Sequence, residues 1–88
     1  MAKQYKRKNK IGTFYYKDPE KTILHREDGP AIDYEGDGGD GGIWFLNGMV
    51  HRIDGPAAEY PNGYKAWWIN GEFIFAIKKS EKIIKRIR

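Results

Sequence analysis

A polar cluster that occurs twice carries the side chains best suited to chemistry. Its members are His25, Arg26 and Asp28 in the first copy and His51, Arg52 and Asp54 in the second. Two histidines and two aspartates could bind a metal ion, or act as base and acid on a phosphodiester. Catalytic sets are asymmetric, however, whereas these groups recur at equivalent positions, as structural residues of a repeat do. We therefore predict a structural role for all six residues, and no catalytic residue, metal site or cofactor.

The expected structural contacts follow from the chemistry of each group. Each aspartate is expected to accept hydrogen bonds from turn amides. Each arginine is expected to pair with an acidic neighbour in the next hairpin. Each histidine is expected to pack edge-on against an aromatic ring of its own repeat.

The clusters belong to a longer internal repeat. The segment 24–34, in which His-Arg precedes Asp-Gly-Pro-Ala, returns as 50–60. The motif Trp-aromatic-x-Asn-Gly at 44–48 returns at 67–71, and 15–19 is a partial earlier copy. Asn-Gly between apolar runs is the strongest short signal for a β-hairpin, because both turn residues take positive φ. Asp-Gly-Pro is a second break, since proline removes a donor from the following strand.

These signals predict an all-β chain, an antiparallel meander of repeated hairpins with a short C-terminal amphipathic helix. The strands are expected near 12–17, 21–26, 30–34, 43–46, 49–53, 57–60, 64–69 and 72–76. Three parts are expected: a basic tail over 1–10, a hairpin-repeat domain over 11–76, and a basic helix over 77–88. The helix would pack on the sheet or extend from it, and its isoleucines would close the last open edge.

Charge is concentrated at the two ends of the sequence. The net charge of +4 is the sum of +5 in residues 1–10, +5 in residues 78–88 and −6 between them. The absence of cysteine excludes disulfides and thiol chemistry and is typical of a reducing compartment. No apolar run approaches the roughly 18 residues of a membrane span, and the N-terminus lacks the apolar stretch of a signal peptide. We therefore expect a cytoplasmic protein without a membrane partner.

Three features are candidate binding surfaces. The basic ends could contact a protein or a nucleic acid. The Gly/Asp-rich loop 35–42 is interpreted as a mobile insertion, an interaction finger or an ion site. Adjacent aromatics predict one core and one exposed member per pair, because neighbours in a strand point to opposite faces. The candidate binding residues are Lys78, Lys79, Lys82, Lys85, Arg86, Arg88, Asp37, Asp40, Tyr16, Phe45 and Trp68.

His-Arg-x-Asp-Gly-Pro-Ala followed by Trp-aromatic-x-Asn-Gly resembles the β-hairpin repeat proteins of bacteriophages and giant viruses, which are distantly MORN-like. The resemblance covers residues 13–76. The repeat itself ends after Gly71, where Phe73-Ile74 replaces the expected His-Arg. It implies a small non-enzymatic protein of the host cytoplasm. Such a protein would sequester or inhibit a host protein or nucleoprotein, for example a CRISPR-type defence complex. The alternative is a nucleic-acid-binding module that uses the basic ends and exposed aromatics, and a His/Asp nuclease or metal-binding protein is a minor third hypothesis.

Overall fold

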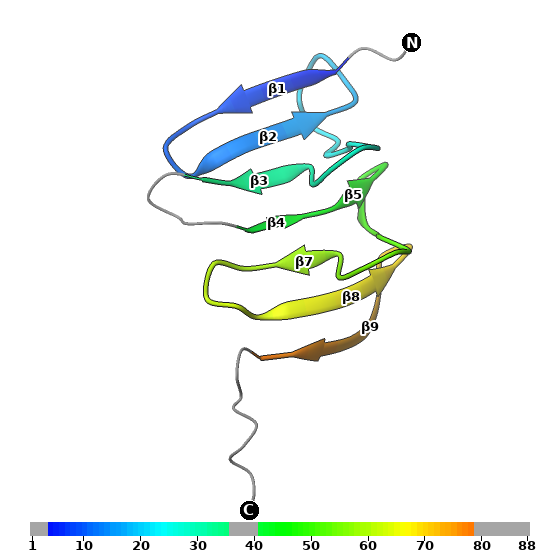
Figure 1. Ribbon diagram of the computed structural model, residues 1–88. Helices are drawn as coiled ribbons and strands as arrows, with labels where there is room; N and C mark the ends of the chain where they lie inside the picture. Colours follow the sequence, from blue (N-terminus) through cyan, green and yellow to red (C-terminus); the bar gives the residue numbers. More distant parts are fainter. Residues whose placement is uncertain (1–3, 36–40, 79–88) are drawn as a thin grey trace, which may run out of the picture.

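The computed structural model describes residues 4–35 and 41–78 (Figure 1). Within these ranges the chain forms antiparallel β-structure and contains no helix, so the all-β prediction is confirmed. The strands are β1 (Tyr5–Lys8), β2 (Gly12–Tyr16), β3 (Ile32–Tyr34), β4 (Gly41–Ile43), β5 (Phe45–Leu46), β6 (Met49–Val50), β7 (Ala58–Glu59), β8 (Lys65–Ile69) and β9 (Glu72–Ile77). The described residues accordingly contain no helix that could cross a membrane.

Seven strands form one sheet in the order β1-β2-β3-β4-β7-β8-β9, and every neighbouring pair is antiparallel. The remaining strands, β5 and β6, form a separate two-stranded hairpin. Figure 1 shows the sheet as a ladder of successive strands, with β1 at one end and β9 at the other. These two strands are therefore the edges of the described sheet.

Each repeat consists of an aromatic strand, a hairpin turn and an interrupted return strand. In the second repeat, β4 and β5 lead to the turn, and β6 begins the return. The loop 51–57 interrupts the return, which resumes as β7 beside β4. Ala57 then joins one repeat to the next: its carbonyl accepts from the Trp44 amide at 2.7 Å, and its amide donates to Ala66 at 2.9 Å.

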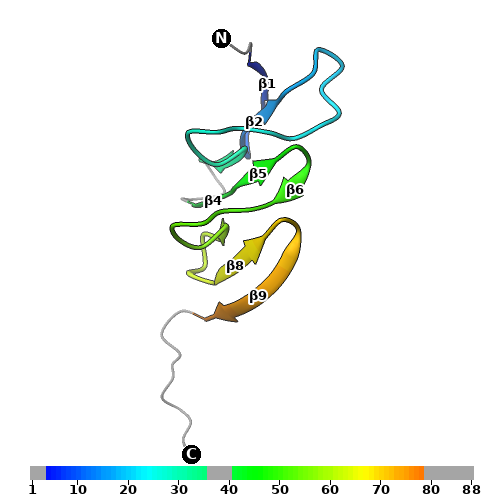
Figure 2. The ribbon, with the colours of Figure 1, turned by 90° about the vertical axis from the view of Figure 1, so that its right-hand side faces the viewer.

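The two predicted Asn-Gly turns are present. Asn47 and Gly48 have φ values of 51° and 82°, and Asn70 and Gly71 have φ values of 49° and 81°. Positive φ at both positions matches the right-handed twist of the flanking strands. Figure 2 shows these turns stacked along one side of the molecule and the Asp-Gly-Pro loops along the other.

The buried core of the described residues consists of four alanines and two tyrosines, Ala31, Ala57, Ala58, Ala66, Tyr15 and Tyr16. Ala31 and Ala57, which follow the two loop prolines, are 0% exposed, and no large side chain among the described residues is fully buried. A thin sheet of this kind has no second layer to bury large residues. Its larger aromatics must therefore be covered by side chains from neighbouring strands.

Several predicted boundaries were wrong. The expected basic tail over 1–10 contains strand β1, which pairs with β2. The expected strand 21–26 is reduced to an isolated bridge between Tyr16 and Leu24, and the strand expected over 49–53 ends at Val50. The expected helix began at Ile77, but Ile77 is the last residue of β9. The rest of that prediction, over 79–88, lies outside the described residues.

Candidate functional site

The two histidines make equivalent contacts with the turn of the following repeat. The backbone amide of Asn47 donates to Nδ1 of His25 at 2.8 Å, and the amide of Asn70 donates to Nδ1 of His51 at 2.9 Å. The next amide of each turn, at Gly48 or Gly71, donates to the carbonyl of the residue before the histidine at 2.8 Å. Each histidine therefore caps the next Asn-Gly turn, with Nδ1 as the acceptor.

The two arginines lie over aromatic rings and are held by their own loops. The Arg52 Cζ atom lies 4.1 Å from the centroid of the Trp44 ring, within cation–π range. Its Nε donates to Asp54 at 3.0 Å, and one Nη donates to the Pro56 carbonyl at 3.1 Å. The first copy has the same contacts at 4.0, 3.1 and 3.1 Å, made by Arg26 to Tyr15, Asp28 and the Pro30 carbonyl.

The glycine of each Asp-Gly-Pro loop is needed for this arrangement. A Cβ atom added at Gly29 would lie 2.9 Å from the Arg26 Cζ atom, and one added at Gly55 would lie 3.0 Å from the Arg52 Cζ atom. The loop therefore approaches the guanidinium more closely than a side chain allows. The motif is explained as a unit: arginine stacks, aspartate and the proline carbonyl hold it, and glycine leaves it room.

These contacts differ in detail from those expected. Each aspartate accepts from the arginine of its own cluster rather than from turn amides. Each histidine meets a backbone amide of the next turn rather than an aromatic ring. The closest match to the expected arginine pairing is Arg26, whose Nη1 lies 3.9 Å from Asp33 in the following strand. The reason is that the loop after each arginine folds back, so that its aspartate and its proline carbonyl reach the arginine of the same cluster.

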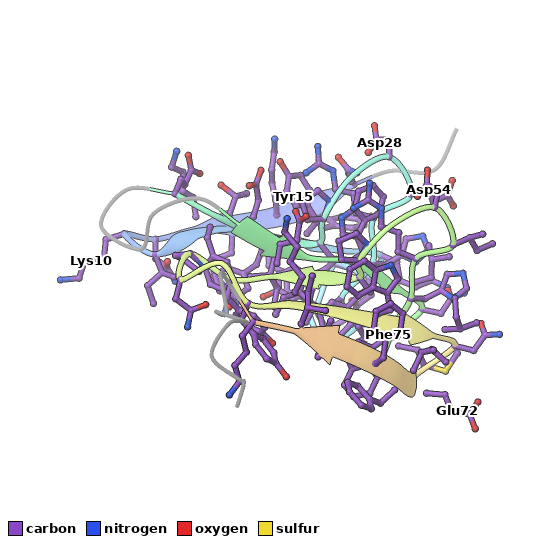
Figure 3. All side chains as sticks on the ribbon, turned by 60° about the horizontal axis from the view of Figure 1, so that its bottom comes forward. Lys10, Tyr15, Asp28, Asp54, Glu72 and Phe75 are labelled. Atoms are coloured by element: carbon purple, nitrogen blue, oxygen red, sulfur yellow. The ribbon has the colours of Figure 1, made fainter. Side chains whose placement is uncertain are left out.

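The described residues contain no group of three or more histidine, aspartate or glutamate side chains that could hold a metal ion. Asp28 and Asp54 lie on separate loops that project from the same side of the molecule (Figures 2 and 3). The loop carboxylates Asp37 and Asp40, which were predicted as binding residues, lie outside the described residues.

A groove of about 390 Å³ lies between the two Asp-Gly-Pro loops. Its lining residues are Arg26, Glu27, Trp44, Leu46, His51, Arg52, Ile53 and Asp54. Ile53 is 81% exposed, and the side chains of Glu27 and Asp54 are 77% and 82% exposed. The groove thus combines an aromatic and aliphatic lining with an exposed isoleucine and two carboxylates.

Glu27 and Ile53 were not predicted from the sequence as binding residues. They occupy the x position of His-Arg-x-Asp, where the two copies differ while the flanking residues agree. A position that varies inside a repeat is free of the structural constraint on its neighbours. That variation was the signal that could have pointed to both residues.

The predicted alternation of core and exposed aromatics was wrong for the first pair. Tyr15 is 9% exposed and Tyr16 is 8% exposed, so both are buried. Cations cover both faces of the strand, since Arg26 lies over Tyr15 and the Arg7 Cζ atom lies 5.9 Å from the Tyr16 ring centroid. The other two predicted aromatic binding residues, Phe45 and Trp68, are half-buried.

The last repeat covers its tryptophans with aromatic rings instead. The Trp67 and Phe75 rings are stacked, with centroids 4.4 Å apart and an interplanar angle of 8°. The Trp68 and Phe73 rings meet edge to face at 5.5 Å. These contacts leave the outer parts of β9 exposed, with Phe73, Ile74, Phe75 and Ile77 at 54%, 52%, 47% and 49%. We call these four residues the β9 apolar edge.

The opposite edge of the sheet is basic. Lys6, Arg7 and Lys8 on β1 are exposed, and the Lys6 ammonium lies 5.5 Å from the Tyr15 ring centroid. The Lys8 ammonium lies 3.5 Å from Glu35, which also accepts from the Thr13 hydroxyl at 2.8 Å. The Thr13 hydrogen bond, followed by the charge of Lys8, holds the pKa of Glu35 below its ordinary value.

A tyrosine cluster lies away from the groove. Its rings belong to Tyr34, Tyr60 and Tyr64, with successive centroids 6.5 and 5.7 Å apart. Burial, and to a lesser extent the neighbouring Tyr60, raises the pKa of Tyr34. Tyr34 is the last residue of β3, and Tyr60 directly follows β7.

Of the predicted basic binding residues, Lys78 is exposed beside the end of β9. Lys79, Lys82, Lys85, Arg86 and Arg88 lie outside the described residues. No family model matches the chain, and no curated protein or solved structure matches it either. A function is therefore to be proposed from the groove, the β9 apolar edge and the basic β1 edge.

Proposed function

We propose that this chain is a small non-enzymatic binding protein of phage type that sequesters or inhibits a host protein in the host cytoplasm. The groove between the two Asp-Gly-Pro loops is the proposed binding site. The observation that carries the proposal is the exposed Ile53, which lines this groove together with Glu27 and Asp54. Protein interfaces have an apolar centre and a polar rim, and Ile53 with Trp44 and Leu46 supplies such a centre.

The groove is held in a fixed shape, which favours binding. Arg52 is anchored by Trp44, Asp54 and the Pro56 carbonyl, and it fixes one wall of the groove. A rigid site loses little conformational entropy when a partner binds. Each arginine and the aspartate of its own cluster neutralise each other, so the net negative charge of the rim comes from Glu27.

The chemistry of the rim specifies the kind of partner. The exposed Glu27 carboxylate beside the apolar Ile53 complements a surface that carries an arginine or lysine side chain near an aliphatic pocket. Proteins that bind nucleic acid present such basic surfaces. A host nucleoprotein, such as a CRISPR-type defence complex, is therefore the proposed target class.

Affinity capture with matched variants tests this proposal. The tagged chain is used as bait in a nuclease-treated bacterial lysate, next to Ile53→Lys and Ile74→Lys, and captured proteins are identified by mass spectrometry. Ile53→Lys places a cation in the groove, whereas Ile74→Lys makes the same change at an exposed residue of β9. We expect a host protein that is still captured after nuclease treatment. Ile74→Lys should capture it as the wild type does, and Ile53→Lys should not. Equal capture by wild type and Ile53→Lys would remove the groove from consideration.

A second candidate function is nucleic-acid binding, and the specific observation in its favour is the basic β1 edge. Its exposed cations, which alternate between the two faces of the strand, could contact phosphates. The aromatic part of that hypothesis is weakened, because Tyr16 is buried and Phe45 and Trp68 are half-buried. Capture that disappears after nuclease treatment, together with DNA or RNA affinity that falls steeply with salt, would favour this function over the first.

A further inference from the structure

The two histidine caps require a neutral imidazole ring. A backbone amide can only donate, so Nδ1 of His51, which accepts from the Asn70 amide at 2.9 Å, must carry a lone pair. The proton of the neutral ring is therefore on Nε2. The Asn47 amide, at 2.8 Å, holds His25 in the same form. An imidazolium ring carries an N–H on both nitrogens, so a protonated histidine cannot make either bond.

We propose that His51 is a pH-sensitive latch between the second repeat and the last hairpin, which β8 and β9 form. A proton on Nδ1 turns this nitrogen from an acceptor into a donor that faces the Asn70 amide, and the bond breaks. The ordinary pKa of a histidine, about 6.5, makes it the side chain that changes charge closest to neutral pH. The latch is closed at neutral pH and is released as the pH falls towards 5.

Release loosens the outer end of the last hairpin and leaves other contacts in place. The Gly71 amide donates to the Val50 carbonyl at 2.8 Å, and the Arg52 amide donates to the Trp68 carbonyl at 3.1 Å. Neither bond involves a titrating group, so both persist when the latch opens. His51 also lines the groove, so the same proton adds a positive charge there. The latch exists whether or not the groove binds a partner.

The charged groups around the two histidines differ at one position. The Glu27 carboxylate lies 3.4 Å from Nε2 of His25, so protonation of that ring breaks its cap but creates an ion pair. Where the first copy has Glu27, the second has Ile53. Within the described ranges no carboxylate forms an ion pair with the His51 ring. Loss of the cap should therefore be offset at His25 and not at His51.

The other charges near His51 have partners of their own. Those that line the groove with it are Arg26, Glu27, Arg52 and Asp54. Each arginine pairs with the aspartate of its own cluster, and Glu27 lies beside His25. The charged residue that follows the capped turn is Glu72, which is exposed. None of these groups acts as a dedicated counter-ion for His51 in the described structure.

Release should lower the stability of the folded chain in acid. Well above pH 6.5 a histidine is neutral in the folded and the unfolded chain, so the cap contributes fully. Below that pH the unfolded chain binds a proton that the capped ring cannot bind. The contribution of the cap is therefore lost as the pH falls.

His51→Asn on the full chain tests the latch. The asparagine Oδ1 is attached to Cγ as Nδ1 is in histidine, so it can accept from the Asn70 amide, but it does not titrate. Urea unfolding is measured at about pH 7.5 and pH 5. Between these values the unfolding equilibrium constant of wild type should rise about four-fold more than that of His51→Asn. His25→Asn should differ less from wild type, because Glu27 offsets the loss at the first junction.

Nitrogen NMR of wild type tests the same latch without any substitution. At pH 7.5 the His51 signals should show an unprotonated Nδ1, and the Asn70 amide signal should move together with the titration of this ring. A proton on Nδ1 at pH 7.5, or an Asn70 amide that ignores the titration, would overturn the proposal. Equal pH dependence of wild type and His51→Asn would do the same. A larger difference for His25→Asn than for His51→Asn would move the latch to the first junction and overturn its assignment to His51.

Discussion

The junctions between repeats and the last repeat cover their aromatic rings with different side chains. At the inner junctions a guanidinium covers an aromatic ring, as Arg26 covers Tyr15 and Arg52 covers Trp44. At the last repeat the ring of Phe75 covers Trp67. The inner junctions also carry a histidine that caps the following turn. Counted from the Asn-Gly turn, Ile74 and Phe75 occupy the positions of His51 and Arg52, one residue later than the replacement at 73–74 predicted from the sequence.

The difference shows what the His-Arg-x-Asp-Gly-Pro motif is for. Its histidine contacts the next turn, and its loop carries the chain across to the next aromatic strand. Both tasks exist only where another repeat follows. After Gly71 no further Asn-Gly turn follows in the sequence, and the strand runs straight on as β9 with a single bulge. The motif is therefore a connector between neighbouring repeats, in the manner of nearest-neighbour interfaces in repeat proteins.

The turn over residues 18–22 is stabilised in a third way, because no histidine precedes it in the sequence. The Asp18 carboxylate accepts from the amides of Thr22 and Ile23 at 3.0 and 2.9 Å and from the Thr22 hydroxyl at 2.6 Å. These bonds, led by the one from the hydroxyl, lower the pKa of Asp18. The first turn therefore caps itself, whereas the later two depend on the preceding repeat.

Removal of a junction arginine should have the largest effect on stability. Arg52→Ala loses the contact with Trp44 and two charge-assisted hydrogen bonds, so we expect a loss of about 3 kcal/mol. Arg26→Ala should cost about as much, because three of its contacts match those of Arg52 to 0.1 Å, and its ion pair with Asp33 offsets the weaker cation–π contact with a tyrosine. Urea unfolding measures both. Arg52→Lys keeps the charge but not the planar fork and should fall between wild type and alanine. Unequal costs for the two arginines would break the equivalence of the junctions.

The aromatic substitute at the last repeat should have a smaller effect. Phe75→Ala loses the stacked ring and part of its burial, for an expected cost of about 1–2 kcal/mol. If Phe75 does the work of an arginine, Phe75→Arg should be more stable than Phe75→Ala by about 0.5 kcal/mol or more. The melting temperatures of wild type, Phe75→Ala and Phe75→Arg, measured at low protein concentration, test this expectation. Arginine and alanine variants of equal stability would show that the stacking on Trp67 is not interchangeable.

Loss of a turn cap should be smaller again. His51→Ala removes the acceptor for the Asn70 amide, which water can partly replace because the bond is exposed. We expect a loss of about 1 kcal/mol in urea unfolding, and the same for His25→Ala. Ile74→His is the matched control, since it places a histidine where no turn follows, and it should bring no comparable gain. A stabilisation as large as the loss in His51→Ala would mean that the histidine acts within its own repeat.

The sequence predicted the repeat and its turns but not its ends. Asn-Gly and Asp-Gly-Pro are local signals, because positive φ and the missing proline donor act within a few residues. The turns at Asn47 and Asn70 were therefore found correctly. Strand β1 was missed because its Tyr-Lys-Arg-Lys sequence has no apolar pattern; it is a strand through its pairing with β2.

A structural role of the polar clusters could be predicted from the sequence, but the groups that they contact could not. Which amide faces His51 Nδ1, or which ring lies under Arg52, depends on how one repeat stacks on the next. That stacking is a tertiary property with no local sequence signal. The same holds for the groove, since Glu27 and Ile53 come close only when the two loops project side by side.

The smallest predicted effect concerns pH at the first edge, where the connector motif is absent and an acid joins β1 to the sheet. Glu35 accepts from the Thr13 hydroxyl and lies beside Lys8, and both contacts favour its ionised form, so its pKa is lower in the folded chain than in the unfolded chain. A lowered folded pKa stabilises the fold at pH values above the unfolded pKa, and this contribution is lost as the pH falls through the folded value. The melting temperature of wild type should therefore drop more between pH 7 and pH 3 than that of Glu35→Gln. Glu59→Gln is a control at a carboxylate of another strand, because Glu59 stands across from Gly42 and Lys65, whereas Glu35 accepts from the Thr13 hydroxyl. If Glu35→Gln and Glu59→Gln change the drop in melting temperature equally, the contacts of Glu35 make no specific contribution to the pH dependence of stability.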